Sequence, residues 1–263
     1  MTDLTGRVAL ITGASSGIGA ATARQLAARG CGIAVNFSKS RAAAEAVAAD
    51  CRKSGVDTLL VQGDVASDTD CRRVVDEAVS HFGHLNYLVN NAGTTKFVAH
   101  RDLAGLSAQD FLDIYAVNTI GPFQMVRAAE SYLRATNGAV VNVSSIAGVY
   151  ATDSSLAYVA SKAALNGLTL GLARVLGPEV RINAVCPGFV EGEWLKQGMG
   201  EAAYAAAQEN WKRHAPLGKT NTPEDIAASI LFFLADAPNI TGETLIIDGG
   251  MRLAQPRIQP VRG

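Results

Sequence analysis

Short, almost continuous apolar runs alternate along the chain with longer alanine-rich segments. A run that is apolar at every position is typical of a strand covered on both faces. Such strands, joined by helices through right-handed crossovers, form a parallel sheet with helices on both sides. The sequence therefore predicts an α/β protein with a doubly wound, parallel, seven-stranded sheet. The expected strands are 7–12, 32–37, 58–63, 86–91, 139–144, 180–185 and 244–248. The expected helices are about 17–29, 40–54, 68–82, 107–135, 154–177 and 222–235.

The pattern continues without a low-complexity linker or an internal repeat, so residues 1–263 are expected to form a single domain. Two helices have recognisable starts: "SDTD" offers cap residues, and "TPEDIA" places Thr, then Pro, then acids. Only the segment at about 190–221 breaks the rhythm, because it is longer and more irregular than a crossover requires. The end, 251–263, holds two prolines and no helical pattern, which indicates a tail or a partner contact.

Charge and cysteine content exclude several classes of function. The formal net charge is −1 and charged residues make up 18%, which provides neither a basic face for nucleic acid nor a polybasic arm for membranes. The start of the chain lacks the pattern of a secretory signal, and no apolar run approaches the ~20 residues of a membrane span. The four cysteines are far apart and form no C-x-x-C, so we expect buried thiols in a cytoplasmic protein.

Three glycines, Gly13, Gly17 and Gly19, fall where the first strand gives way to the first helix. Glycines let a backbone approach a pyrophosphate closely, and a helix N-terminus supplies free N–H groups and a positive dipole end. A glycine cluster alone also suits an ordinary tight turn. Its place after a strand and before a helix favours a dinucleotide-binding turn, which would make the domain a Rossmann fold.

The end of the second strand bears on the choice of dinucleotide. An acid there would bind the ribose 2′-hydroxyl of NAD, but Phe37 or Ser38 occupies that place, followed by Lys39 and Arg41. Hydroxyl and cationic groups suit a 2′-phosphate, so NADP(H) is favoured and NAD(H) stays open. The other interpretation is that Lys39 and Arg41 are a solvated helix start.

Polar residues also gather at the ends of later strands. "NNAG" (90–93) ends the fourth strand and "VSS" (143–145) ends the fifth. Tyr158 and Lys162 lie one helical turn apart, so that phenol and ammonium share a face. Taken alone, that pair is either a reaction centre or two surface residues. Asn118 lies within the expected helix 107–135, where an amide often answers a local backbone need.

Taken together, these motifs resemble the short-chain dehydrogenase/reductase family in its single-domain form, in particular its β-ketoacyl reductase-like and glucose dehydrogenase-like members. The resemblance covers roughly residues 5–250. It rests on T-G-x-x-x-G-I-G at 12–19, N-N-A-G at 90–93, Asn118, Ser145, Y-x-x-x-K at 158–162, P-G at 187–188 and D-G-G at 248–250, in this order.

The resemblance implies a set of catalytic roles. Tyr158 is the general acid in ketone reduction and the general base in alcohol oxidation, with its pKa lowered by Lys162 and by the positive ring of an oxidised cofactor. Ser145 hydrogen-bonds the substrate oxygen. Lys162 also holds the nicotinamide ribose, and Asn118 holds a water that links Lys162 to solvent.

The resemblance also implies a cofactor-binding set along the strand ends, with Asn90 on its adenosine side. Many relatives place a threonine near position 192, where this chain has Gly192, so that contact is not assigned. The implied cofactor-binding residues are Gly13, Ser15, Ser16, Gly17, Ile18, Gly19, Phe37, Ser38, Lys39, Asp64, Val65, Asn91, Ala92, Gly93, Tyr158, Lys162, Pro187, Gly188 and Val190.

The expected function is an NAD(P)(H)-dependent oxidoreductase that transfers a hydride between the cofactor and a small carbonyl or secondary alcohol. "PLGK…TPEDIA" resembles β-ketoacyl reductases, but a small ketone, sugar or hydroxy compound fits equally. A carrier-protein substrate needs basic residues at the rim, and "RATNGA" and "LGPEVR" offer only Arg134 and, beside Glu179, Arg181. The alternative is a non-catalytic dinucleotide-binding sensor or scaffold.

Three further expectations concern assembly, substrate and metal. The helices 107–135 and 154–177 are expected to pair in a homotetramer or homodimer. The segment 190–221 is expected to cover the substrate, with aromatics that either pack an apolar substrate or dock the lid. His81 and His84 lack an evident third ligand, so no metal is expected.

Overall fold

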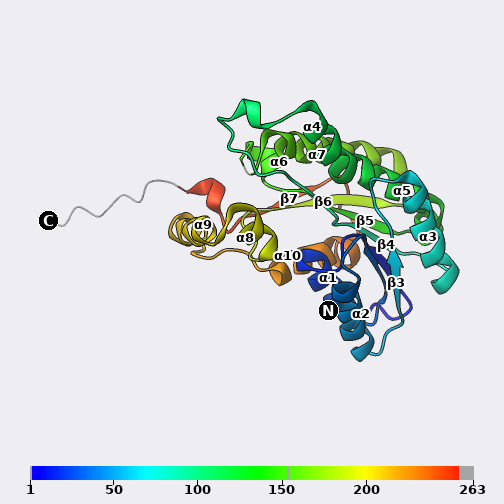
Figure 1. The fold of residues 1–263 in the computed structure, drawn as a ribbon. Coiled ribbons are helices and arrows are strands. Elements are labelled where there is room, and N and C mark those ends of the chain that lie inside the picture. Colours follow the sequence, from blue (N-terminus) through cyan, green and yellow to red (C-terminus); the bar gives the residue numbers. More distant parts are fainter. Residues whose placement is uncertain (1, 153, 255–263) are drawn as a thin grey trace.

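The computed structural model describes residues 2–152 and 154–254 (Figure 1). Its centre is a parallel sheet of seven strands in the order β3-β2-β1-β4-β5-β6-β7, as the sequence predicted. The order reverses between β1 and β4, and ligands in such sheets bind beyond the carboxyl ends of the strands at this point. The strands are β1 (Val8–Ile11), β2 (Gly32–Phe37), β3 (Thr58–Gln62), β4 (Tyr87–Asn90), β5 (Ala139–Val143), β6 (Arg181–Pro187) and β7 (Thr244–Ile247).

Helices cover both faces of the sheet, and two hydrophobic cores fill the space between (Figure 1). One core lies under α1, α2 and α10, and the other under α3, α5 and α7. The central strands β1, β4 and β5 are buried along their whole length, which explains their continuous apolar runs. These helices are α1 (Gly17–Ala27), α2 (Arg41–Lys53), α3 (Asp68–Phe82), α5 (Gly121–Ala135), α7 (Leu156–Leu176) and α10 (Pro223–Leu231).

Both predicted helix starts are confirmed. The Ser67 hydroxyl accepts the N–H of Asp70 at the start of α3. Thr222 and Asp225 form a reciprocal capping box at the start of α10, with Pro223 in the first turn. These local bonds satisfy N–H groups that have no partner within the helix.

The helix predicted over 107–135 is interrupted. It consists of α4 (Ala108–Tyr115), a π-helical segment at Ala116–Ile120, and α5. Pro122 has no N–H to donate to the carbonyl four residues earlier, so the α-helical bonding pattern cannot continue through Asn118. The predicted helix 222–235 likewise ends as α10 at Leu231 and continues as a π-helical segment, Phe232–Asp236. Hydrogen bonds from residues distant in the sequence, Thr94 to Asn118 and Arg181 to Phe233, favour both departures from the α-helix.

The prediction that 190–221 is irregular is wrong. Two helices lie there, α8 (Glu193–Met199) and α9 (Glu201–His214), separated by Gly200 at φ +82°. The alanine-rich run before Trp211 has a high helix propensity, which accounts for α9. A short helix α6 (Ala147–Tyr150) and 3₁₀ turns at Leu103–Gly105 and Met251–Leu253 were not predicted. The rest of the predicted tail, 255–263, lies outside the described residues.

Across residues 2–152 and 154–254, no helix is both long enough and apolar enough to span a membrane.

Candidate active site

The glycine-rich turn joins β1 to α1 and packs directly against the segment after β4. A β-carbon on Gly13 would lie 2.9 Å from Ala92 Cα, and one on Gly19 would lie 2.5 Å from Asn91 Nδ2. Both positions therefore exclude a side chain. Gly17 differs, because its φ is +52° and, within the described structure, a β-carbon there would meet nothing within 4 Å. The backbone at Gly17 is thus bare and open to an approaching ligand.

The start of α1 fits an anionic group. Within the described residues, Ser16 makes no side-chain capping bond, and the first turn holds no acid that would compete for the free N–H groups. Ser16 and Gly17 are exposed, whereas Ser15 and Ile18 are partly buried. Free N–H groups and the positive end of the helix dipole match the pyrophosphate of a dinucleotide.

Thr12 and Asn91 fix the segment after β4 to this turn. The Thr12 hydroxyl accepts the N–H groups of Asn91 and Ala92, each at 3.0 Å. The Asn91 amide donates in return to the carbonyls of Thr12, at 2.9 Å, and Gly13, at 3.0 Å. The predicted "NNAG" motif therefore works partly by shaping the glycine turn. Asn90 instead points into the core, where its amide donates to Asn142 Oδ1 at 2.9 Å.

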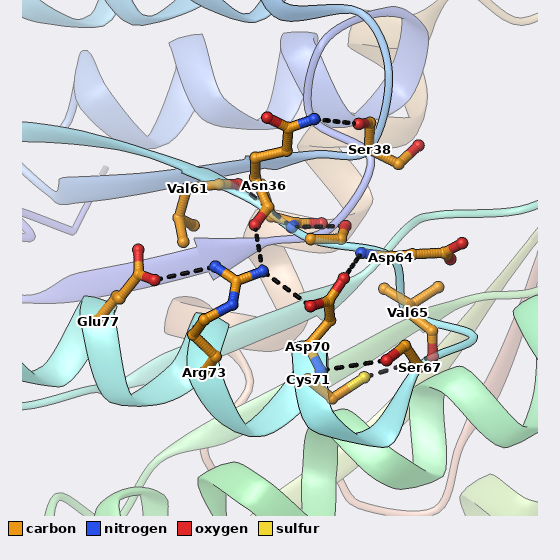
Figure 2. Close-up of polar contacts among 12 residues, drawn as sticks. Asn36, Ser38, Val61, Asp64, Val65, Ser67, Asp70, Cys71, Arg73 and Glu77 are labelled. Atoms are coloured by element: carbon orange, nitrogen blue, oxygen red, sulfur yellow. Dashed lines mark hydrogen bonds and ion pairs between the residues drawn. The ribbon is translucent and has the colours of Figure 1, made fainter.

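Asn36 also shapes the site, and the sequence analysis missed it. Its Oδ1 accepts the Gly13 N–H at 3.4 Å. Its Nδ2 donates to the carbonyls of Val61, at 3.3 Å (Figure 2), and Gly63, at 3.2 Å. One buried amide thus ties the glycine turn to the end of β3. The sequence signal that could have found Asn36 is a single asparagine near the carboxyl end of an otherwise apolar strand.

The predicted ribose-contact residues separate into two kinds. Phe37 is only 1% exposed and its side chain belongs to the core, so its place in the cofactor-binding set stays a prediction that the ring itself does not support. A strand-end aromatic that faces a covering helix is buried by its position in the pleat. Ser38 and Lys39 are exposed beyond it. The Arg41 guanidinium lies 5.3 Å from the Phe37 ring centroid and donates to Gln62 Oε1 at 3.3 Å.

Asp64 and Val65, which the family resemblance places in the cofactor-binding set, follow β3 on a turn held by α3. Asp70 Oδ2 accepts the Asp64 N–H at 2.9 Å (Figure 2). Arg73 donates to Asp70 Oδ1 at 2.9 Å and to the Gln62 carbonyl at 2.8 Å. The Asp64 N–H, and then Arg73, lower the pKa of Asp70 below its ordinary value. Asp64 stays exposed while Val65 is buried.

Tyr158 and Lys162 lie on the same face of α7, as their spacing predicted. The Lys162 Nζ is 5.6 Å from the centroid of the Tyr158 ring. It also donates to the Val143 carbonyl at the end of β5, at 2.8 Å. Both side chains are almost fully buried, which strengthens the interaction between phenol and ammonium.

The two serines after β5 have different surroundings. Ser144 donates to the Lys162 carbonyl at 3.3 Å and so fastens β5 to α7. Ser145 Oγ accepts the Ala147 N–H at 3.1 Å, at the start of the turn into α6. Ser145 is the strand-end serine predicted to hydrogen-bond the substrate oxygen, whereas Ser144 bonds the main chain of α7.

Asn118 lies in the π-helical segment with its side-chain amide engaged on both atoms. Oδ1 accepts the Thr94 N–H at 2.8 Å, and Nδ2 donates to the Thr94 carbonyl at 2.9 Å and to Ser161 Oγ at 3.0 Å. A β-carbon on Gly93 would lie 3.6 Å from Asn118 Oδ1 and 3.8 Å from Lys162 Nζ. The structure thus brings Asn118, Gly93 and Lys162 together, and Asn118 holds the loop that follows "NNAG".

The "PG" motif closes the site beyond β6. The Pro187 carbonyl accepts the Ile146 N–H at 3.0 Å, one residue after Ser145, and the Gly188 N–H reaches the Ile247 carbonyl at 2.8 Å. Val190 forms an isolated bridge with Asn221. These bonds place Pro187 and Gly188 at the same edge of the sheet as Ser145.

The histidines lie apart from this edge and bind different partners. His81 Nε2 is 2.8 Å from Asp57 Oδ2, and His84 Nε2 is 3.0 Å from the Gly6 carbonyl. Among the described residues no group of three His, Cys, Asp or Glu side chains is placed to hold a metal ion.

Comparison with known proteins assigns the family. A family model described as Enoyl-(Acyl carrier protein) reductase matches residues 13–252. A solved structure from Burkholderia xenovorans, described as a short-chain dehydrogenase/reductase, is 40% identical and superimposes with a TM-score of 0.88, covering 94% of this chain and 98% of its own. The chain belongs to the short-chain dehydrogenase/reductase family. The resemblance predicted from the motifs is confirmed, and with it an NAD(P)-dependent oxidoreductase.

Several relatives within the short-chain dehydrogenase/reductase family are named for ketoacyl reduction. A ketoacyl reductase of the granaticin polyketide synthase from Streptomyces violaceoruber is 42% identical over 247 residues, covering 94% of this chain and 96% of the relative. The 3-oxoacyl-[acyl-carrier-protein] reductase FabG of Staphylococcus aureus is 37% identical over 246 residues, covering 92% and 97%. A solved NAD⁺-bound xylitol dehydrogenase is 30% identical with a TM-score of 0.86, covering 95% and 100%.

Proposed function

We propose that this protein uses NADPH to reduce the ketone of a 3-oxoacyl thioester to a secondary alcohol. The observation that carries the proposal is the Tyr158–Lys162 pair, whose ammonium lies 5.6 Å from the phenol ring, at the sheet edge that also holds Ser145 and the glycine turn. A proton donor beside a dinucleotide turn is what carbonyl reduction requires.

The cofactor, when bound, supplies a hydride to the carbonyl carbon. Tyr158 gives its phenolic proton to the carbonyl oxygen, so that C=O becomes CH–OH and NADPH becomes NADP⁺. Ser145 donates a hydrogen bond to the same oxygen as negative charge develops on it. The Lys162 ammonium stabilises the phenolate left on Tyr158.

Tyr158 must then regain a proton. Lys162 is the nearest cation on its helix, and Asn118 and Gly93 border the Lys162 ammonium. A water held beside Asn118 would link that ammonium to solvent and return the proton. Because the side-chain amide of Asn118 is bonded to Thr94 and Ser161, this water would bind the main chain of the π-helical segment.

NADPH is the favoured cofactor because of the residues after β2. Ser38 and Lys39 are exposed where an acid would otherwise bind a ribose hydroxyl, and the Arg41 guanidinium lies 5.3 Å from the centroid of the Phe37 ring. A hydroxyl and two cations favour a 2′-phosphate. The NAD⁺-bound xylitol dehydrogenase shows that a related structure binds the other cofactor, so cofactor choice is one arm of the test below.

The thioester is favoured by similarity to the granaticin ketoacyl reductase and to the 3-oxoacyl-[acyl-carrier-protein] reductase FabG. Of the rim cations expected to meet a carrier protein, Arg134 is paired with Glu130 at 3.0 Å and with Glu179 at 2.6 Å. Arg181 instead donates to the carbonyls of Phe233, Leu234 and Ala237, after α10. The proposal therefore concerns the thioester and does not specify its carrier.

The assembly proposed is a homodimer or homotetramer. Apolar side chains that are exposed in a single chain lie on the helices expected to pair: Leu112 on α4, Phe123 on α5, and Leu170 and Val175 on α7. Burying them against a second copy removes apolar surface from water. Light scattering tests this, and a monomeric mass would contradict it.

The test of function is turnover of 3-oxobutanoyl-N-acetylcysteamine thioester with NADPH or NADH, followed by nicotinamide absorbance. We expect oxidation of NADPH with formation of the 3-hydroxy thioester, and a lower kcat/KM with NADH. Xylitol with NAD⁺ serves as the competing reaction. Turnover of xylitol alone would overturn the substrate class. Tight NADPH binding without turnover of any carbonyl or alcohol would favour the sensor or scaffold.

A further inference from the structure

The aromatic side chains of the lid segment 190–221 separate into two sets. Tyr204 is 7% exposed, and its ring lies 5.2 Å from that of Phe189, just beyond β6. The Trp211 ring is 6.1 Å from Phe189 and fills the space beside Gly188. These two rings dock α9 onto the sheet. Tyr204 and Trp211 thus have one of the two roles that the sequence left open for the aromatics of this segment, which is to dock the lid.

Trp194, at the start of α8, has different neighbours. Its ring centroid lies 6.2 Å from that of Tyr158 and 5.9 Å from that of Phe97. It is nevertheless 47% exposed. The Trp194 ring contacts Tyr158, the proton donor, and leaves about half of its own surface uncovered. It therefore provides an apolar wall beside the position of the reacting carbonyl.

Phe97 and Gly198 hold that wall in place. A β-carbon on Gly198 would overlap the Phe97 ring, so α8 lies against that ring through a position with no side chain. Trp194 and Gly198 are four residues apart and share one face of α8. Phe97 therefore supports the helix under Gly198 and the indole of Trp194 at the same time. The orientation of Trp194 is fixed by packing.

The charged groups near the wall are already paired. Lys96, next to Phe97, binds Asp110 at 2.9 Å, and Lys196, two residues after Trp194, binds Glu193 at 3.1 Å. An acidic substituent on the substrate would have to compete with these carboxylates. An apolar substituent would only cover exposed indole surface, which is favourable.

We propose that Trp194, supported by Phe97, determines substrate specificity by packing against a bulky apolar substituent on the reacting carbonyl carbon. This inference rests on the proposed function. Among 3-oxoacyl thioesters, it favours those whose ketone carries a branched or cyclic hydrocarbon group over the methyl ketone. The hydride still adds to that carbon, and the Tyr158 proton to its oxygen.

The experiment compares two N-acetylcysteamine thioesters that differ only in this substituent, 3-oxobutanoyl (methyl) and 3-cyclohexyl-3-oxopropanoyl (cyclohexyl). The measured quantity is the ratio of kcat/KM for cyclohexyl to that for methyl. Trp194→Ala is expected to lower the ratio about tenfold or more, and Trp194→Phe to stay within about threefold of wild type. Gly198→Ala, which forces α8 away from Phe97, is expected to lower the same ratio.

The matched control is Phe232→Ala. Phe232 is 42% exposed and contacts one ring, that of Phe233, in the π-helical segment after α10. The ratio of kcat/KM values measured for Phe232→Ala should equal that of wild type. A wild type that reduces the methyl but not the cyclohexyl thioester, or a Trp194→Ala ratio equal to wild type, overturns this inference alone. A wild type that reduces neither thioester overturns the proposed function, and this inference with it.

Discussion

Lys162 donates a hydrogen bond of 2.8 Å from its ammonium to the main-chain carbonyl of Val143. One end of this bond is the last residue of β5 and the other is the catalytic face of α7, so the sheet fixes the position of the charge. Ser144 makes a second link between the same two elements. The cation beside Tyr158 is therefore placed by the fold and requires no ligand to position it.

Lys162→Met tests the role of that charge. Methionine fills similar space but offers no ammonium, so the phenolate formed by proton transfer loses its nearest cation. We expect kcat for 3-oxobutanoyl thioester reduction to fall by about 10²-fold or more. Circular dichroism of the variant controls for folding. A kcat within experimental error of wild type would show that the ammonium has no part in the reaction.

The preference for NADPH can be tested at the end of β2. Ser38→Asp places an anion where a 2′-phosphate is proposed to bind, and like charges at this distance repel. We expect KM for NADPH to rise about tenfold or more while KM for NADH changes little. Ser38→Asn, which has similar size and no charge, is the matched control. Equal effects of Asp and Asn on NADPH would contradict the proposed phosphate site.

Arg181 carries a prediction about stability. Its half-buried guanidinium donates to the carbonyls of Phe233, at 2.6 Å, Leu234, at 2.8 Å, and Ala237, at 2.9 Å, and so satisfies the end of the helix after α10. Arg181→Met leaves these carbonyls without a donor. The free energy of unfolding in urea is expected to fall by about 3 kcal/mol.

The control for this prediction is Arg213→Met. Arg213 is exposed, and the polar partner that it has among residues 2–152 and 154–254 is Glu209, one helical turn away, at 3.4 Å. Its removal should change the unfolding free energy by less than about 0.5 kcal/mol. Equal losses for the two variants would mean that the three carbonyl bonds add nothing to stability.

The lowered pKa of Asp110 predicts how the free energy of unfolding depends on pH. The Ser107 N–H of the α4 capping box, and then the Lys96 ammonium, lower the pKa of Asp110 from 3.8 to about 2. A lowered pKa means that folding favours the ionised form, so this contribution is complete above about pH 4 and is lost as the pH falls toward 2. Asp110→Asn should therefore be less stable than wild type at neutral pH, with a difference that shrinks in acid. A difference independent of pH would contradict the assignment.

The sheet and the reacting groups were predictable because their signals are local. Most strand positions are apolar, since helices cover both faces of the sheet, and the predicted catalytic residues follow strand ends or share one helical turn. These two rules place Ser145 at a strand end and Tyr158 and Lys162 on one helix face, while the roles predicted for these residues came from the family resemblance.

The remaining features depend on contacts between distant parts of the chain. The π-helical segment at Asn118 is held by Thr94, and the one after α10 by Arg181. The packing of Phe97 against Gly198 joins the loop after β4 to α8, and these two segments share no pattern in the sequence. Phe37 is buried because a helix covers its side of β2. The sequence alone does not show on which face of the sheet a strand-end aromatic side chain lies.

The central claim is that Tyr158 donates the proton to the ketone, and Tyr158→Phe tests it most directly. This change removes one oxygen and leaves the ring that contacts Trp194 and Lys162. With 3-oxobutanoyl thioester and saturating NADPH, we predict a fall in kcat of about 10²- to 10⁴-fold, while the Kd for NADPH stays within about threefold of wild type. An unchanged kcat in this variant, with wild-type turnover measurable, would contradict the account.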